Sequence, residues 1–170
     1  FLYPYLLALG DWIGFRGLNL ALWAVLIGCI SLTGSMILIH RLSRSGGASE
    51  GIAWVVTLAF AGGASAWHAF SGMETMLVVL LTLLTFQALW DVWESSGDRH
   101  LRLLVASSCA LTLVRPEGGW LALGAVISAG WVQRALLRKR PRLALILILP
   151  VAALAVQPVV NLVLTGSAVA

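Results

Sequence analysis

The sequence contains few charged residues. Asp, Glu, Lys and Arg make up 11% of its 170 residues, whereas a soluble globular domain carries roughly 25%. Hydrophobic residues reach 60% and the mean hydropathy is +0.96. So little charge excludes a domain that faces water on all sides, and we expect a membrane protein whose partners include membrane lipids.

The sequence also contains only two cysteines and has no continuous basic face. Cys29 and Cys109 both lie inside apolar stretches, where thiols act as small packing groups more often than as disulfide partners. The formal net charge is +4, but the cations lie in short clusters between apolar runs rather than on one basic face. This distribution argues against a nucleic-acid partner.

Long apolar runs are abundant. A helix of about 20 apolar residues crosses the ~30 Å hydrocarbon layer, and the predicted fold is an all-α, polytopic transmembrane helix bundle of about six spans. The predicted helices cover residues 18–39, 52–69, 73–92, 102–114, 118–133 and 143–164. Residues 1–15 are expected to form an interfacial helix or the remnant of a truncated span. We treat residues 1–170 as a single transmembrane domain and expect it to be part of a longer protein.

The basic clusters predict the direction of the spans. Nine of the eleven Lys and Arg residues lie at 41–44, 99–102 and 134–142, which share one face if the spans alternate. The positive-inside tendency makes that face cytoplasmic. Residues 68–72 and 115–119 then face outward, and the tryptophans gather near both predicted interfaces, as aromatic belts do.

An arginine, a proline and a glutamate interrupt the apolar stretch "TLVRPEGGWLALG". The twelve residues between Arg102 and Arg115 would rise only about 18 Å as a helix. One continuous helix over 102–133 would be about 48 Å long and would move the cluster at 134–142 to the outer face. We therefore predict a hairpin, with its turn at 115–119 below the outer surface.

Ionisable residues at membrane depth mark functional sites by default. On this reasoning Arg115 faces a polar cavity open to the outer side, with Glu117 beside it. The alternative is that Arg115 and Glu117 only end two helices and extend to the lipid headgroups. Both interpretations remain open at this point.

The second predicted outer turn lies in "WHAFSGMETMLVVLL". Ser71 and Glu74 have the spacing of a capping box at a helix start, which by itself accounts for both residues. In the functional interpretation Glu74 faces the same cavity as Arg115, either to orient it or to help bind a metal or a hydroxyl group. His68 is a further candidate for that cavity.

These segments resemble a known family. "HAFSGMETML" and the later "TLVRPEGGWLAL" are similar to the paired "SGLET" and "RPEG" segments of bacterial GT-C-type membrane glycosyltransferases, including the arabinofuranosyltransferase-like and mannosyltransferase-like branches. The opening "LYPYLLALG" and the closing "NLVLTGSAVA" resemble weaker segments of the same family. The resemblance covers nearly the whole chain.

The resemblance implies an enzyme of the bacterial inner membrane with its active face outward. Such enzymes transfer a sugar from a polyprenyl-phosphate donor, and their proposed base is an acidic residue in a first outer loop, which we expect to precede Phe1. No catalytic residue is therefore assigned in this chain. Arg115 becomes the candidate that binds the donor phosphate, with Glu117, Glu74 and His68 in support. No metal ligands are assigned, and a divalent metal stays open as a cofactor.

A second function is compatible with the same residues. The chain could be a non-catalytic membrane subunit or a transporter in which Arg115 binds an anionic lipid or solute. An acidic outer loop after an upstream helix would favour the enzyme, because that loop carries the family's proposed base. The donor sugar, the acceptor and the oligomeric state are not readable from these residues.

The charge pattern makes a testable prediction about sidedness. A cysteine introduced at Ser45 should be labelled from the cytoplasmic side, because it lies directly after the cluster at 41–44, in the predicted cytoplasmic segment 41–49. Labelling with a membrane-impermeant thiol reagent, applied to either side of the membrane, measures this. Labelling at Ser45 only from outside intact cells would reverse the predicted topology.

Overall fold

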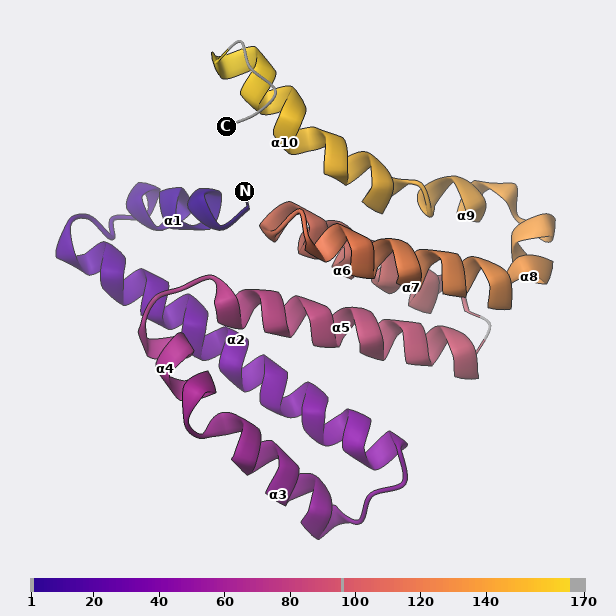
Figure 1. Ribbon diagram of the computed structural model, residues 1–170, viewed down its shortest axis with the longest axis horizontal. Helices are drawn as coiled ribbons and strands as arrows, with labels where there is room; N and C mark the ends of the chain where they lie inside the picture. The colour runs from indigo at the N-terminus through magenta and orange to yellow at the C-terminus, as the bar shows by residue number, and fades with distance from the viewer. Residues whose placement is uncertain (1, 96, 166–170) are drawn as a thin grey trace. The chain divides into compact units, whose positions relative to one another are not determined.

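The computed structural model describes residues 2–95 and 97–165, and every regular element in this part of the chain is an α-helix (Figure 1). Phe1 and residues 166–170, which end the segment "NLVLTGSAVA", lie outside the described residues, as does residue 96. The predicted all-α class is therefore confirmed for the described part.

Ten helices follow one another along the described chain. They are α1 Leu2–Trp12, α2 Leu18–Ser45, α3 Glu50–Ala61, α4 Ala64–Phe70, α5 Thr75–Glu94, α6 Asp98–Val114, α7 Gly118–Val132, α8 Arg134–Lys139, α9 Pro141–Ile146 and α10 Leu149–Thr165. Each predicted span corresponds to one or two of these helices, and α1 corresponds to the predicted N-terminal interfacial segment.

Three helical runs are long and apolar enough to cross a membrane. These are α2, α5 and the run Pro141–Val163, and the bent pair α3 and α4 gives a fourth if it forms a single span. The helices α6 and α7 have 17 and 15 residues, which correspond to about 26 Å and about 23 Å. Both are too short to count by length, so six spans remain a prediction.

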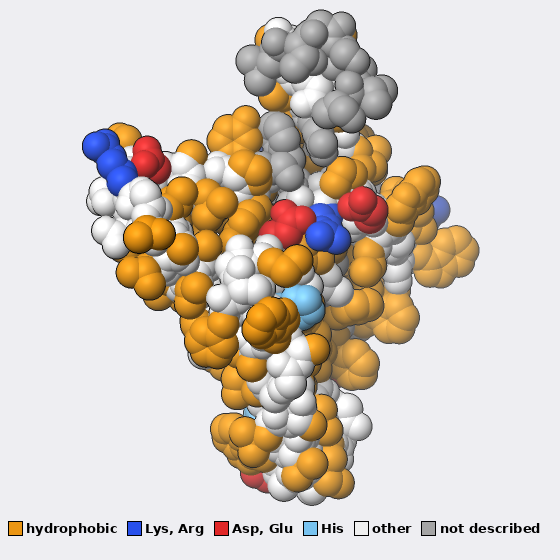
Figure 2. Space-filling model, turned by 60° about the vertical axis from the view of Figure 1, so that its left-hand side comes forward, with side chains coloured by type: hydrophobic (Ala, Val, Ile, Leu, Met, Phe, Trp, Pro, Cys, Tyr) orange, Lys and Arg blue, Asp and Glu red, His pale blue; other side chains and the backbone are white. Residues whose placement is uncertain are grey.

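Apolar side chains dominate the surface. Figure 2 shows them over most of the visible face, with few charged groups between them. Leu18, Trp120 and Val163 are more than three quarters exposed, and seven of the eight tryptophans are among the exposed large side chains. Exposed apolar area of this extent marks a lipid or partner surface, which agrees with helices that could span a membrane.

The chain divides into two compact units, each described here by itself. The first comprises Tyr3–Leu83, and in it α2 packs against α3 and α4. The buried face of α2 is a stripe of mostly small residues at helical spacing. Its members are Ala24, Gly28, Ser31, Ser35 and Leu38. Small residues at such positions let helix backbones approach closely, which is the usual basis of helix packing in membranes.

Two buried hydroxyl groups in this unit bond to carbonyls of their own helices. Ser35 Oγ donates to the Ser31 carbonyl at 2.8 Å, and Thr57 Oγ1 donates to the Ala53 carbonyl at 2.8 Å. A hydroxyl that bonds to the preceding turn carries no unpaired donor into the apolar interior. These polar residues are therefore compatible with tight apolar packing and indicate no ligand.

The closest helix approach in the first unit involves Gly28. A Cβ atom built on Gly28 would lie 2.2 Å from the Ala69 carbonyl oxygen of α4, well inside van der Waals contact. Only glycine therefore permits this crossing of α2 and α4.

The helix predicted over residues 52–69 is broken, and the single-helix prediction is wrong there. Helix α3 ends at Ala61, and α4 begins at Ala64 after a bend of 52°. Gly63 has φ 58°, a left-handed conformation that glycine adopts without strain. The adjacent glycines Gly62 and Gly63 were the available signal for this break.

The second unit contains residue 2 and the chain from Leu84 onward. Its centre is the antiparallel pair of α6 and α7, which run side by side (Figure 1), with α10 packed on both. A buried apolar cluster joins the end of α5 with α6, α7 and α9. Its largest members include Val92, Leu101, Leu104, Val126 and Leu143. Gln133 Nε2 donates to the Val92 carbonyl at 2.6 Å, so α5 is also tied to the end of α7.

The start of α6 and the end of α2 differ from the sequence predictions. Helix α6 begins at Asp98 rather than near residue 102, so the first arm of the hairpin is longer than the predicted ~18 Å. The length of this arm therefore indicates a turn below the surface less strongly than predicted. Helix α2 continues to Ser45, so the first basic cluster is helical and not a loop; Arg44 in its last turn favours this extension.

We predict that Gly28→Ala destabilises the protein, because the added methyl group would meet the Ala69 backbone. Overpacking of this kind typically costs about 1–3 kcal/mol, more than the ~1 kcal/mol that alanine gains over glycine in a helix. Thermal unfolding in detergent, followed by circular dichroism, measures the change.

The matched control is Gly124→Ala. A Cβ atom at Gly124, in the middle of α7, meets nothing within 4 Å, so this variant should be as stable as the parent or slightly more stable. Equal stability of both variants would contradict the proposed close approach of α2 and α4.

Candidate functional site

The turn between α6 and α7 is the first part of the candidate site. Helix α6 ends at Val114, and Arg115 follows in an extended conformation with φ −139° and ψ 127°. Pro116 explains this geometry, since a proline disfavours the helical conformation in the residue before it. The predicted hairpin with its turn at Arg115–Gly119 is therefore confirmed.

Two glycines hold the start of α7 against its neighbours. A Cβ atom at Gly118 would lie 2.8 Å from Leu111 Cγ and 3.0 Å from the Leu111 carbonyl oxygen. One at Gly119 would lie 2.5 Å from Leu154 Cδ2 of α10. Neither glycine has a positive φ among the described residues, so their role is to leave space: a methyl group at Gly118 would press on the Leu111 backbone, and one at Gly119 would displace the Leu154 side chain. The tip is thereby packed on α6 and α10.

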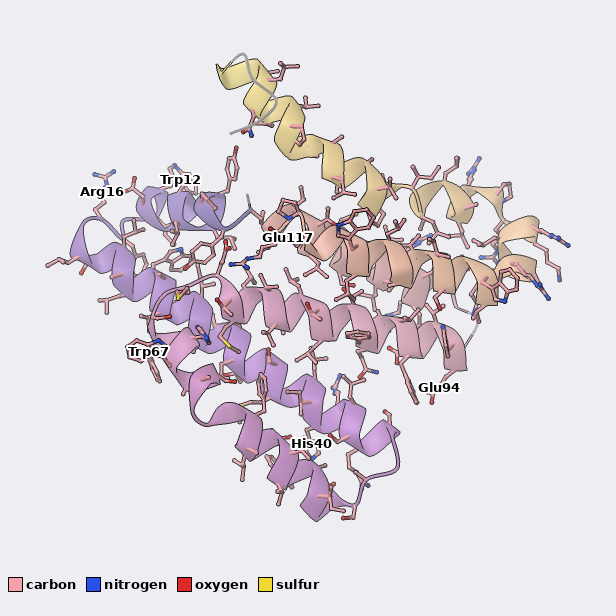
Figure 3. The ribbon with its side chains drawn as sticks, viewed as in Figure 1. Trp12, Arg16, His40, Trp67, Glu94 and Glu117 are labelled. Carbon is pink, nitrogen blue, oxygen red and sulfur yellow. The ribbon has the colours of Figure 1, made fainter. Side chains whose placement is uncertain are left out.

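Both charged residues of the tip are exposed. Arg115 and Glu117 are accessible, and Figure 3 shows Glu117 at the end of the helical pair. Glu117 occupies the N-cap position of α7, but its side chain makes no capping hydrogen bond. A guanidinium group presented by a packed turn can bind a carboxylate or phosphate through two parallel hydrogen bonds. The geometry thus fits anion binding, and extension to headgroups stays an alternative.

The turn that contains Ser71 is the second part, and it differs from the predicted capping box. Ser71 Oγ donates to the His68 carbonyl at 3.0 Å, and Ser71 is the residue that ends α4. Helix α5 begins only at Thr75, so Ser71 cannot act as its N-cap. The capping-box interpretation is wrong, because Gly72, with φ 68°, separates the serine from the next helix.

Tyr3 joins this turn and was not singled out from the sequence. Its hydroxyl donates to the Gly72 carbonyl, and burial, followed by the nearby Glu74 carboxylate, raises the pKa of Tyr3 above its ordinary value of 10.0. The phenol therefore stays protonated as a donor at neutral pH. The aromatic "LYPY" stretch was the only signal, and it does not distinguish Tyr3 from Tyr5.

His68 lies in the last turn of α4, two residues before the helix ends at Phe70. Its ring is partly buried, and its Nδ1 atom has no hydrogen-bond partner in the part of the chain that the structure describes. A buried imidazole nitrogen without a partner is uncommon, and neighbouring atoms cover this one. Trp67, its neighbour, points away from α4 and is 70% exposed (Figure 3).

The four candidate residues come from both units. Arg115 and Glu117 belong to the unit from Leu84 onward, whereas Glu74 and His68 belong to the unit Tyr3–Leu83. Arg115 and Glu117 lie on the same turn, whereas His68 lies in the last turn of α4 and Glu74 directly precedes α5. That all four face one cavity remains a prediction.

No group of three or more His, Cys, Asp or Glu side chains within residues 2–95 and 97–165 is placed to hold a metal ion. The comparisons with known proteins add no assignment: no protein-family model, no curated protein and no solved structure matches the chain. The site must therefore be judged from its own chemistry.

The raised pKa of Tyr3 predicts a late titration step. The part of the tyrosinate absorbance that comes from Tyr3, which is missing in Tyr3→Phe, should appear only above the ordinary tyrosine pKa of about 10. Below that pH the Tyr3–Gly72 hydrogen bond should contribute its full stabilisation to the fold. This contribution should disappear as the pH rises through the raised pKa. An ultraviolet titration of both proteins in detergent measures the step.

Tyr5→Phe is the matched control for this titration. It leaves Tyr3 in place and should preserve the late step. If the absorbance that is missing in Tyr3→Phe titrates at or below the ordinary tyrosine pKa, the conclusion that the Tyr3 phenol is buried and donates a hydrogen bond is wrong.

Proposed function

We propose that this protein is the membrane part of a glycosyltransferase that takes a sugar from a polyprenyl-phosphate donor, with Arg115 binding the donor phosphate. The observation that carries the proposal is the hairpin tip. There Pro116 and two closely packed glycines hold an exposed arginine at the end of two apolar helices. The paired segments around residues 68–77 and 112–123, which resemble those of GT-C-type enzymes, support the same assignment.

The chemistry of the transfer suits such an arginine. The bond between the anomeric carbon and the donor phosphate oxygen breaks, the acceptor oxygen bonds to that carbon, and a base outside the described residues takes the acceptor proton. The leaving phosphate gains negative charge in the transition state, so a cation already held beside it lowers the barrier. A guanidinium is always charged and binds two phosphate oxygens at once.

The surroundings of the tip favour a donor that is partly lipid. Trp120, close to Arg115 in sequence and at the start of α7, is 79% exposed, as expected for an aromatic residue at a membrane interface. The exposed apolar sides of the helices offer a surface for a polyprenyl chain. Glu117, two residues from Arg115, can orient the guanidinium.

The proposal includes a topology. The protein would be a multi-pass protein of a bacterial inner membrane with about six spans, and α6 and α7 would form a hairpin that reaches the outer side. The three basic clusters support this direction, because they would all face the cytoplasm.

Arg115→Lys in the full-length protein tests the proposed phosphate contact. Lysine keeps the charge but cannot form two parallel hydrogen bonds to the phosphate. The variant should therefore insert and purify normally but transfer sugar about a hundredfold more slowly. Losing one such contact costs on the order of 3 kcal/mol. Turnover with a saturating radiolabelled polyprenyl-phosphate sugar measures this.

Arg16→Lys is the matched control. Arg16 is also exposed and lies outside the three basic clusters, and its Nε lies 3.9 Å from Asp11 Oδ1 in a surface ion pair, which contributes little. It should leave turnover unchanged. Near-normal turnover of Arg115→Lys would reject the phosphate contact and favour a residue that only ends a helix. If the unmodified protein transfers no sugar but Arg115→Lys weakens its binding of polyprenyl phosphate, the transporter or subunit alternative holds.

A further inference from the structure

A second concentration of basic side chains lies at the other end of α6, away from the hairpin tip. A pocket of about 360 Å³ is lined there by Asp98 and Arg102 of α6 and by Lys139, Arg140 and Arg142, which lie where α8 meets α9. This end carries two of the three basic clusters, so the charge pattern predicts it to face the cytoplasm. The pocket is therefore distinct from the proposed outer site.

Packing holds the walls of this pocket in place. Leu143, the residue after Arg142, is 6% exposed and belongs to the buried cluster with Leu101 and Leu104 of α6. An ion pair between Arg140 and Asp98 joins the two walls directly. The cations are therefore presented by a packed corner of the second unit rather than by a loose tail.

The charges in the pocket are unbalanced. Asp98 is its only acidic residue, and Arg140 already pairs with it. Arg102, Lys139 and Arg142 have no ion-pair partner among the described residues, and all three are exposed. Three unpaired cations around one hollow attract a ligand with more than one negative charge.

An apolar hollow continues from the basic pocket along α6. It has about 490 Å³, shares Asp98 and Arg102 with the basic pocket, includes Arg99 at the same end, and is lined further along by Leu103 and Ala106. Leu103 is 50% exposed, and Ala106 is exposed as well. The two hollows together form a track that is basic at one end and apolar along the helix.

We propose that this track binds an anionic phospholipid, with its phosphate groups on Arg102, Lys139 and Arg142 and an acyl chain along Leu103 and Ala106. Basic pockets between helices at the cytoplasmic side are suited to lipid headgroups with several charges. A soluble phosphate compound would leave the apolar part empty, whereas a phospholipid fills both parts. The site does not depend on the proposed glycosyl transfer.

The test measures binding of tetraoleoyl cardiolipin, whose headgroup carries two phosphates, to the full-length protein by native mass spectrometry. Arg102→Gln combined with Arg142→Gln should weaken binding about thirtyfold, at roughly fivefold for each cation removed near the membrane surface. Both side chains are exposed, so circular dichroism should show an unchanged fold.

The matched control is Arg134→Gln combined with Arg138→Gln. These substitutions remove the same charge from α8, but the two residues line neither hollow. The affinity should therefore fall less than threefold, because only long-range attraction is lost. Equal losses in the two double variants would overturn the site and leave only general attraction to anionic lipid. An unchanged affinity in Arg102→Gln with Arg142→Gln would overturn it as well.

Ala106→Trp separates a phospholipid from a free phosphate. The added ring fills the apolar hollow without changing charge, so it should weaken cardiolipin binding about tenfold, equivalent to displacing a few methylene groups from the groove. Normal binding in Ala106→Trp, or equally tight binding of inorganic phosphate, would overturn the lipid assignment. Arg115→Lys should leave cardiolipin binding unchanged, so this test and the test of sugar transfer fail independently.

Discussion

Close approach of helix backbones at small residues is the constraint on which this structure depends. Gly28 places α2 directly against the Ala69 carbonyl of α4, and Gly118 and Gly119 place the start of α7 against α6 and α10. Helices surrounded by lipid gain little from burying apolar area, since the lipid is equally apolar, and they associate through such close packing instead. A single methyl group at these points therefore disturbs the arrangement more than a larger change on an exposed apolar face.

The same packing restricts the hairpin tip on which the proposed function depends. Arg115 is not buried and makes no contribution to the apolar cluster, yet the turn that carries it is restricted by Pro116 and by two closely packed glycines. A preorganised cation stabilises developing negative charge without reorganising when the reaction occurs. At the opposite end of α6, Leu143 and the Arg140–Asp98 ion pair hold a second group of cations in a comparable way.

Much of the architecture was predictable from the sequence. The predictions that were wrong have local causes. Apolar run length indicated the helices, and the charges around Arg115 indicated the α6–α7 hairpin. The break at Gly63 and the early start of α6 at Asp98 were missed. At Gly63 the long apolar run predicted one helix, although a pair of glycines indicated a break. At Asp98 the helix was predicted to begin only with the apolar run, although the polar residues before it are compatible with a helix. Tyr3 was missed because its partner is a backbone carbonyl at Gly72, which no side-chain pattern reveals.

The sequence by itself determined that the described chain is helical, that several helices can cross a membrane, and that Arg115 stands at a turn, because run length and proline act on their immediate neighbours. Only the tertiary structure decided which glycines permit helix contact, which hydroxyl bonds to which carbonyl, and which cations near Arg102 surround one pocket. These depend on distances between residues far apart in the chain, and hydropathy and spacing contain no information about such distances.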